Sequence, residues 1–572
     1  MNKRQDEIMK YKLPVGVSDF RKIVKGNYVF TDKTLLIKEV MDDGADIILV
    51  TRPRRFGKTL NLSMLYYFLD HSQPKSENLF EKLNIGQDKA FCEEHQHQYP
   101  VIFISFKDVK QLRYKDAYAN IVALISGLYT AHQYLLDGEV LAEHERAKFM
   151  SLLRGEGLKA YIEASLSQLC IYIHRYCGKN PIILIDEYDT PIQEAYLKKY
   201  YEKMVELMRG ILGQALKDNS YLTKAVVTGI TRISQESLFS GLNNIEVYSL
   251  LREDYGQYFG FTEEEVVKLL EETKQPVSLG AIKEWYNGYQ IGKHVLYNPW
   301  SIIKCLKNHG ELEEYWLNTS GNALIGDLLR KAKPIVKEEF EELLQGKVIT
   351  QALSENLVFP DIRKKPEALW SLLLYAGYLK VLEKERQGNK LICHLSIPNK
   401  EVSFVYDDIV DDWFSEAISI ESYDSFVRSL VDGDMEKFEM YITSYIMQSG
   451  SYFDFNKNTP ERVFHVFILG LVVGLRGEYY IRSNQESGLG RFDVVMLPKQ
   501  HERAGILLEF KATDDPKKLK AKAQEGLKQV KDKQYLELFR QNGVKEVLAI
   551  GLAFCGKQMS LVSEKIVIDE CD

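Results

Sequence analysis

The sequence predicts an α/β protein whose N-terminal half contains a parallel β-sheet with helices on both faces. Between residues 1 and 260, short apolar segments alternate with stretches of helical periodicity. The apolar segments are Ile47–Val50, Val101–Ile104, Ile182–Ile185 and Ala225–Val227. Continuous apolar strands separated by helices are typical of a parallel sheet that is buried on both faces.

The loop after the first apolar segment has the composition of a phosphate-binding loop. Residues 52–59 read Arg-Pro-Arg-Arg-Phe-Gly-Lys-Thr, and a helix is predicted from Thr59 to Leu69. A P-loop needs backbone N–H groups around the phosphates, a lysine on the β- and γ-phosphates and a hydroxyl for Mg²⁺. Gly57 permits a close backbone approach, Lys58 is the expected phosphate lysine, and Thr59 is the expected Mg²⁺ ligand.

One position departs from the formal P-loop pattern, because Arg52 stands where the first glycine is usual. A chance match of a short basic loop is therefore the alternative. The buried strand before the loop and the helix after it favour a P-loop of an NTPase, since the mechanism requires both. We expect the loop residues Arg54, Arg55 and Phe56 to border the nucleotide as well.

An acidic pair, Asp186 and Glu187, ends the third apolar segment. At the carboxyl end of a strand, Asp186 is expected to hold Mg²⁺ through water, and Glu187 is expected to activate a hydrolytic water. The alternative is a polar turn after a core strand. A whole strand, Val101–Phe106, lies between this pair and the P-loop along the chain. That arrangement fits P-loop ATPases with an inserted strand and a catalytic glutamate.

The fourth apolar segment ends in further polar residues. Thr228 is suited to be a polar sensor near the γ-phosphate, and Arg232 is a candidate stabiliser of transition-state charge. A purely structural arginine at position 232 fits the sequence equally well.

Several short segments make the chain resemble the bacterial AAA-ATPase-like family. They are Tyr28–Thr34, Arg52–Thr59, Leu184–Asp189, Thr228–Arg232, Phe259–Thr262, Trp285–Tyr289 and Tyr297–Trp300. The resemblance covers most of the chain, and within that family arginine at the first-glycine position is normal. It implies an ATPase domain over residues 1–260 and a C-terminal nuclease-like domain of the PD-(D/E)XK type.

The middle of the chain predicts three further parts. Residues 261–330 have helical patterns that open with a capping box at 262–265, and we expect them to form a helical lid. Residues 331–415 contain an apolar helix, Leu369–Tyr375, followed by two alternating segments, which favours a winged-helix-like domain. Residues 416–450 are expected to be connecting helices.

The C-terminal part, residues 451–572, contains a second candidate site. A hairpin is predicted from Phe492–Leu497 and Ile506–Phe510, then a lysine-rich helix over about 517–539 and a strand over 547–553. Glu509 and Lys511 are two apart on one strand, so they face the same side, and Asp493 opens the neighbouring strand. The two carboxylates can share one Mg²⁺, beside which Lys511 can orient a water or stabilise charge.

Two more residues complete the resemblance to the PD-(D/E)XK pattern and its α/β restriction-endonuclease-like fold. Glu461, on a predicted apolar helix, is the expected outer metal ligand, and Gln529, on the lysine-rich helix, is expected to contact the nucleophilic water or the DNA backbone. Lysines between 517 and 533 could follow a phosphate backbone. The alternative is a salt-bridged strand beside a solvated lysine helix.

Composition limits the class of protein. The 572 residues include 81 acidic and 74 basic side chains, and this net charge of −7 argues against a general nucleic-acid coat. Seven cysteines without a CxxC pair are typical of reduced cytosolic thiols. The N-terminus lacks a signal-peptide pattern, and the most apolar run, Val463–Leu475, is too short to span a bilayer. We therefore expect a cytoplasmic protein without membrane contact.

Together these features predict an ATP- and Mg²⁺-dependent protein, namely a P-loop ATPase with metal-dependent DNA endonuclease activity. The expected partners are ATP and nucleic acid, DNA in preference to RNA, and the oligomeric state, including a homo-oligomer, stays open. The alternative is a nucleotide-gated regulatory or DNA- or partner-binding protein whose nuclease fold is inactive. A small-molecule kinase would need an acceptor pocket, for which the sequence carries no signal.

Overall fold

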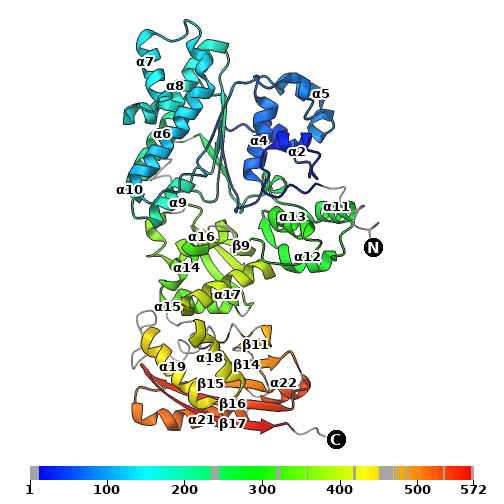
Figure 1. The fold of residues 1–572 in the computed structure, drawn as a ribbon, viewed down its shortest axis with the longest axis vertical. Coiled ribbons are helices and arrows are strands. Elements are labelled where there is room, and N and C mark those ends of the chain that lie inside the picture. Colours follow the sequence, from blue (N-terminus) through cyan, green and yellow to red (C-terminus); the bar gives the residue numbers. More distant parts are fainter. Residues whose placement is uncertain are drawn as a thin grey trace. The chain divides into compact units, whose positions relative to one another are not determined.

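The structure is a computed structural model that falls into two compact units (Figure 1). The first unit comprises Met1–Asn318 with Thr350–Val402, and the second comprises Thr319–Ile349 with Ser403–Asp572. The structure describes residues 12–233, 244–316, 322–344, 346–356, 358–415, 420–449, 468, 472, 475, 477–483, 486–487, 490–491, 493–500, 503–532 and 535–568.

The core of the first unit is a parallel five-stranded sheet in the order β2-β3-β4-β1-β5. Its strands are β1 (Ile47–Thr51), β2 (Val101–Ser105), β3 (Ile182–Asp186), β4 (Lys224–Gly229) and β5 (Ile245–Tyr248). The expected parallel sheet is confirmed, and β5 is an additional edge strand. Strand β4 lies between β1 and β3 in the sheet. Strand β2, which comes between β1 and β3 along the chain, forms one edge of the sheet, and β5 forms the other.

Helices cover both faces of this sheet, as the sequence predicts (Figure 1). Helices α6, α8 and α10 lie on one side, and α2 and α4 lie on the other. The helices of this part are α2 (Phe20–Lys25), α3 (Leu35–Asp42), α4 (Lys58–Leu69), α5 (Lys89–His95), α6 (Tyr114–Ala131), α7 (Glu143–Leu153), α8 (Lys159–Cys177), α9 (Thr190–Leu197) and α10 (Tyr201–Leu216). Helix α4 begins at Lys58, one residue earlier than expected.

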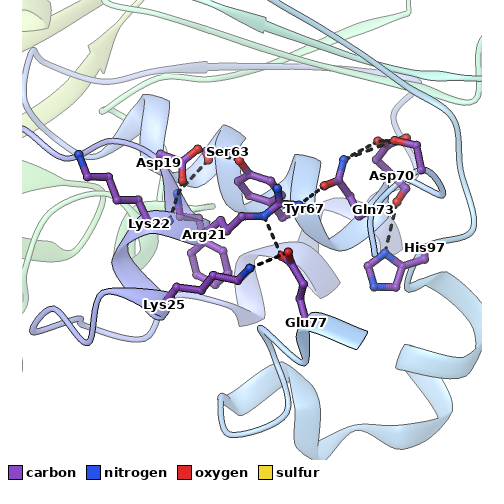
Figure 2. Close-up of polar contacts among 12 residues, drawn as sticks. Asp19, Arg21, Lys22, Lys25, Ser63, Tyr67, Asp70, Gln73, Glu77 and His97 are labelled. Carbon is purple, nitrogen blue, oxygen red and sulfur yellow. Dashed lines mark hydrogen bonds and ion pairs between the residues drawn. The ribbon is translucent and has the colours of Figure 1, made fainter. Parts of the chain in front are cut away.

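Polar contacts fasten α2 to α4 (Figure 2). The backbone N–H of Phe20 donates to Ser63 Oγ at 3.0 Å, and the Tyr67 hydroxyl donates to Asp19 Oδ2 at 2.7 Å. The Arg21 guanidinium lies over the Tyr67 ring, 4.4 Å from its centre. These contacts fix the helix that carries Lys58 from the side opposite the sheet.

Residues 261–316 form the expected helical segment, with a small hairpin that the sequence did not predict. Its elements are α11 (Glu263–Thr273), α12 (Leu279–Tyr286), β6 (Tyr289–Ile291), β7 (His294–Leu296) and α13 (Pro299–Lys307). The predicted capping box is present, because Thr262 Oγ1 accepts from the Glu265 N–H and Glu265 accepts from the Thr262 N–H. Asn298 caps α13 directly before Pro299.

A helix and an antiparallel hairpin follow, as expected for a winged-helix-like segment. The elements are β8 (Ile349–Leu353), α16 (Pro366–Ala376), β9 (Lys380–Gln387) and β10 (Lys390–Ser396), and the strands pair in the order β8-β10-β9. Gly377, with φ of 91°, ends α16 in the left-handed conformation. The two compact units divide residues 331–415 at 349/350 and 402/403, and the domain boundaries expected from the sequence remain a prediction.

The second unit contains a mixed sheet in the order β11-β14-β15-β16-β17. Its strands are β11 (Tyr479–Ser483), β14 (Val494–Pro498), β15 (Gly505–Ala512), β16 (Glu546–Cys555) and β17 (Gln558–Val567), with a separate short pair, β12 (Glu486–Ser487) and β13 (Gly490–Arg491). The expected hairpin is β14–β15, which is antiparallel, and the expected last strand is β16, parallel to β15. Strand β17 is an addition to the prediction.

The second unit contains α18 and α19 within residues 416–450, which were expected to be helical. The described helices are α14 (Asn322–Arg330), α15 (Pro334–Leu344), α17 (Lys400–Ser415), α18 (Ile420–Val431), α19 (Met435–Ser449), α21 (Leu519–Asp532) and α22 (Leu536–Gln541), of which α17 begins in the first unit. The prediction of one lysine-rich helix to about residue 539 is wrong, because α21 ends at Asp532 and a separate helix, α22, begins at Leu536. Tyr535, directly before α22, is buried in the domain core. Among the described residues, no helix has the length and apolarity needed to cross a membrane.

Candidate functional site

The loop between β1 and α4 has the shape of an anion-binding turn. Arg55 and Gly57 have positive φ angles of 69° and 81°. A Cβ at Gly57 would meet no heavy atom within 4 Å, so the need for glycine there comes from the backbone conformation. The chain then enters α4 at Lys58, where the N-terminus of a helix presents free N–H groups and a positive dipole end.

Lys58 is held inside this loop. Its side-chain ammonium donates to the carbonyl of Arg52 at 2.9 Å and to the carbonyl of Pro53 at 2.8 Å. Burial lowers its pKa, and the nearby carboxylates, led by Glu187, oppose that shift. The expected phosphate lysine therefore lies at the start of α4 with its charge within the loop.

Asp186 gathers three hydroxyl groups at the carboxyl edge of the sheet. Thr59 Oγ1 donates to Asp186 Oδ2 at 2.8 Å, Thr228 Oγ1 donates to Oδ1 at 2.9 Å, and Ser105 Oγ donates to Oδ2 at 3.2 Å. Burial raises the pKa of Asp186, the charge of Glu187 adds to the rise, and the first two hydroxyls oppose it. The structure thus brings together the predicted residues at 59, 186 and 228. Ser105 was not predicted, although its position at the end of β2 was a usable signal.

Glu187 and Arg232 lie on the turns that follow β3 and β4. Glu187 has φ of 51° and is partly exposed, and it accepts a hydrogen bond from Thr190 Oγ1 at 3.0 Å. Arg232, also partly exposed, comes three residues after the end of β4. Because β3 and β4 are parallel neighbours, both turns leave the same edge of the sheet as Asp186.

Arg52, at the position of the usual first glycine, hydrogen-bonds to backbone carbonyls of its own unit. Its guanidinium is completely buried and donates from Nη1 to the Thr51 and Tyr248 carbonyls at 2.9 and 2.7 Å. Its Nη2 donates to the carbonyl of Asp254 at 3.0 Å. Burial lowers the pKa of Arg52 to about 9. The side chain therefore ties the end of β1 to β5 and the turn after it, which explains how an arginine fits at the start of this loop.

The second candidate site lies on the β14–β15 hairpin. The Phe510 N–H donates to Asp493 Oδ2 at 2.7 Å, and the Asp493 N–H donates to Glu509 Oε2 at 3.4 Å. Lys511 Nζ lies 3.6 Å from Glu509 Oε1, and Glu509 is only 1% exposed. The three residues expected from the sequence therefore converge, with Glu509 and Lys511 on the same side of β15.

Helix α21 brings Gln529 to the same place. The helix crosses the sheet closely, because a Cβ at Gly551 would lie 2.1 Å from the carbonyl oxygen of Ala523. Gln529 hydrogen-bonds with Tyr535, whose pKa is raised to about 12 by burial, with a contribution from the charge of Glu509. Tyr535 thus lies beside the predicted cluster, and no sequence motif pointed to it.

Two family models match the chain, one over each region that holds a candidate site. Residues 14–239 match the family described as predicted AAA-ATPase, and residues 459–564 match the PD-(D/E)XK nuclease superfamily. The chain carries an AAA-ATPase-like domain and a PD-(D/E)XK nuclease-superfamily domain. The resemblance found in the sequence is confirmed for both regions.

One curated relative spans both domains. It is described as an uncharacterized protein in the vnfD 5′ region of Azotobacter chroococcum mcd 1 and is 26% identical over 574 residues, which cover 96% of this chain and 98% of the relative. A solved structure, the Walker-type ATPase PABY2304 of Pyrococcus abyssi, is 15% identical and covers 69% of this chain and 98% of its own, with a TM-score of 0.35. That score is too low to support an argument.

Within the first unit, residues of β6 and α13 contact the P-loop. The Arg55 guanidinium lies 4.3 Å from the centre of a Trp300 ring, and burial lowers the pKa of Arg55. The Phe56 ring packs edge-on against Tyr289, with 5.0 Å between ring centres. Both partners belong to the segments 285–289 and 297–300 that carry the family resemblance.

Two other P-loop residues contact different segments of the same unit. Arg54 Nη2 lies 3.5 Å from Gln193 Oε1 on α9, and a Cβ at Gly377 would lie 2.9 Å from Pro53 Cβ. The four residues 53–56 therefore each meet a different part of the fold. A movement of this loop would therefore change contacts with α9, β6, α13 and the end of α16.

In the nuclease-superfamily domain, the predicted outer ligand Glu461 lies outside the described residues. The described part of the chain shows no group of three or more His, Cys, Asp or Glu placed to hold a metal ion. Lysines of the predicted phosphate-binding face have acidic neighbours, since Lys522 pairs with Glu525 at 2.6 Å and Lys518 lies 3.8 Å from Asp515. The positive charge of that face is partly neutralised.

Proposed function

We propose that the protein is an ATP-dependent enzyme that processes nucleic acid. Its AAA-ATPase-like domain binds and hydrolyses Mg·ATP, and its nuclease-superfamily domain cuts phosphodiester bonds with Mg²⁺, in DNA in preference to RNA. The observation that carries the proposal is the Asp186 carboxylate, which accepts from Thr59 and Thr228 at 2.8 and 2.9 Å beside the P-loop lysine.

The residues of the P-loop fit Mg·ATP. Lys58 and the first N–H groups of α4 would hold the β- and γ-phosphates, and Arg54, Arg55, Phe56 and Gly57 would border them. Thr59 and Asp186 offer the hard oxygen donors that Mg²⁺ prefers, and they already lie within hydrogen-bonding distance of one another. Bound Mg²⁺ would neutralise charge on the phosphates.

The chain's own residues would then act on the water and on the developing charge. Glu187 lies on the left-handed turn after β3, where it accepts from Thr190, and it would take a proton from the attacking water. Thr228 would contact the γ-phosphate as a sensor, and Arg232 would offset negative charge in the transition state.

The carboxylates of the nuclease-superfamily domain fit a divalent cation less completely. Asp493 and Glu509 each supply a carboxylate, and the Asp493 backbone N–H donates to Glu509 Oε2 at 3.4 Å. Glu461 is the proposed third ligand. A bound Mg²⁺ would polarise the scissile phosphate. Lys511 would orient the attacking water or stabilise charge, and Gln529 would contact that water or the DNA backbone.

Purified protein incubated with ATP, Mg²⁺ and linear, circular or single-stranded DNA tests the proposal. We expect ATP hydrolysis, and DNA cleavage that EDTA stops. Nucleotide binding and DNA binding without turnover of either would instead identify a nucleotide-gated regulatory or DNA- or partner-binding protein with an inactive nuclease fold.

Glu187→Gln tests the catalytic base. We expect kcat for ATP hydrolysis to fall about 100-fold while the Kd for ATP changes less than about twofold, because glutamine keeps the shape but cannot take the proton. Phosphate release and equilibrium binding of labelled ATP measure the two quantities. Glu206→Gln, on the exposed face of α10, is the matched control, and a parent-like kcat in Glu187→Gln removes Glu187 from the mechanism.

A further inference from the structure

We propose that Tyr188 and Asp189 are positioning residues that hold residues 230–233 in place and thereby set the position of Arg232 for ATP hydrolysis. The inference rests on the proposed ATPase function. Both residues directly follow Glu187, so one short turn after β3 carries the proposed base and the two groups that bind the segment after β4.

Tyr188 binds the far end of the segment. Its hydroxyl donates to the carbonyl of Thr231 at 2.7 Å and accepts from the Ile233 N–H at 3.1 Å, and the side chain is completely buried. One phenol therefore bridges the residues on either side of Arg232. Burial raises the pKa of Tyr188, so the phenol keeps the proton that it donates.

Asp189 binds the near end. Its Oδ2 accepts from the backbone N–H groups of Ile230 and Thr231, both at 2.9 Å, and from Thr231 Oγ1 at 3.1 Å. The same oxygen accepts from Gln193 Nε2 at 2.7 Å. A fully buried carboxylate needs several donors, and here most of them come from the segment before Arg232.

Gly229 shows how closely the two side chains press on the segment. A Cβ at this position would lie 2.6 Å from Tyr188 Cε1 and 2.8 Å from Asp189 Oδ1. No side chain fits between the end of β4 and the turn after β3. The segment therefore leaves the sheet in direct contact with Tyr188 and Asp189.

These contacts bind the turn after β3 rigidly to residues 230–233. Tyr188 and Asp189 together bind three backbone N–H groups and one carbonyl within residues 230–233. Arg232 lies inside that stretch, so its backbone moves with the turn that carries Glu187. Fixing the base and the positive charge relative to each other lowers the reorganisation that the reaction requires. Gln193, which donates to Asp189, also connects this turn to the P-loop, because its Oε1 lies 3.5 Å from Arg54 Nη2.

Tyr188→Phe tests the inference, because it removes both hydrogen bonds and keeps the ring. We expect kcat for ATP hydrolysis to fall about tenfold with KM and the Kd for ATP within about twofold of the parent. In the double variant with Arg232→Ala, we expect kcat to be no lower than in Arg232→Ala alone. Tyr129→Phe is the matched control, since its buried hydroxyl donates to the Ser165 carbonyl at 2.9 Å between α6 and α8, and it should keep the parent kinetics.

A parent-like kcat in Tyr188→Phe, or losses that multiply in the double variant, overturns the inference. Hydrogen exchange supplies a readout that does not depend on turnover. The amides of residues 230–233 should exchange faster in Tyr188→Phe than in the parent and in Tyr129→Phe, and equal exchange overturns the inference even if the parent hydrolyses no ATP. If Tyr188→Phe does not fold, Asp189→Asn undergoes the same measurements with the same expected outcome.

Discussion

Replacing Lys58 with alanine is expected to abolish ATP binding and, with it, all ATP hydrolysis. Lys58 is the cation that the P-loop encloses at the start of α4, where it donates to the carbonyls of residues 52 and 53 at 2.9 and 2.8 Å. Without it the bound phosphates lose a charge-assisted contact in a site shielded from water, where such contacts are strongest. Equilibrium binding of labelled ATP to the purified variant measures the loss.

The control for this change is Lys38→Ala, which removes a half-exposed lysine that pairs with Asp88 at 2.6 Å in the same unit. It should bind ATP like the parent. Circular dichroism of both variants separates lost affinity from lost folding. Parent-like affinity in folded Lys58→Ala would contradict the P-loop assignment.

The second large effect is expected in the nuclease-superfamily domain. Glu509→Gln and Lys511→Met should each lower DNA cleavage about 1,000-fold, because one removes a metal-binding charge and the other removes the cation beside it. Glu509 is buried on β15, and its Oε2 accepts from the backbone N–H of Asp493, which directly precedes β14. A hairpin that brings two carboxylates to one site favours a divalent cation there. Gel assays of cleavage, with Mg²⁺ or Mn²⁺, measure the activity.

Binding of Mn²⁺ to the intact protein gives an independent measurement. Glu509→Gln should weaken it, whereas Glu525→Gln, which alters an exposed residue paired with Lys522 on α21, should change neither binding nor cleavage. If parent and Glu509→Gln cleave DNA equally well, the cleavage comes from another source. The domain is then better described as a binding module.

The strands that the sequence predicted have either continuous apolar residues or a regular alternation, as in β9 and β10. Strands β1 and β3 are buried at every position, so hydrophobicity alone marks them. The missed strands lie at sheet edges. Strand β5 has partly exposed residues at 245 and 246, and β17 mixes exposed and half-buried positions, so neither produces a continuous apolar segment.

The residues of a candidate site could be predicted where a local sequence motif lies at the carboxyl end of a parallel strand. Asp186 and Thr228 lie at the carboxyl ends of β3 and β4, and Thr59 lies on the helix that follows β1. The carboxyl ends of parallel strands meet at one edge of a sheet, so the convergence of these residues could be expected. The contacts of Arg52 and Tyr535 depend on segments far along the chain. A sequence motif carries no information on such tertiary partners, which is why both emerged only from the structure.

The division of the chain into units has a consequence for the order in which the protein is synthesised. The first unit is completed by residues 350–402, which are made after residues 319–349 of the second unit. Gly377, which lies against Pro53 of the P-loop, belongs to that late segment. The P-loop therefore cannot reach its final packing during synthesis until Gly377 has been made. A chain cut at any single position between 319 and 402 would leave both units incomplete.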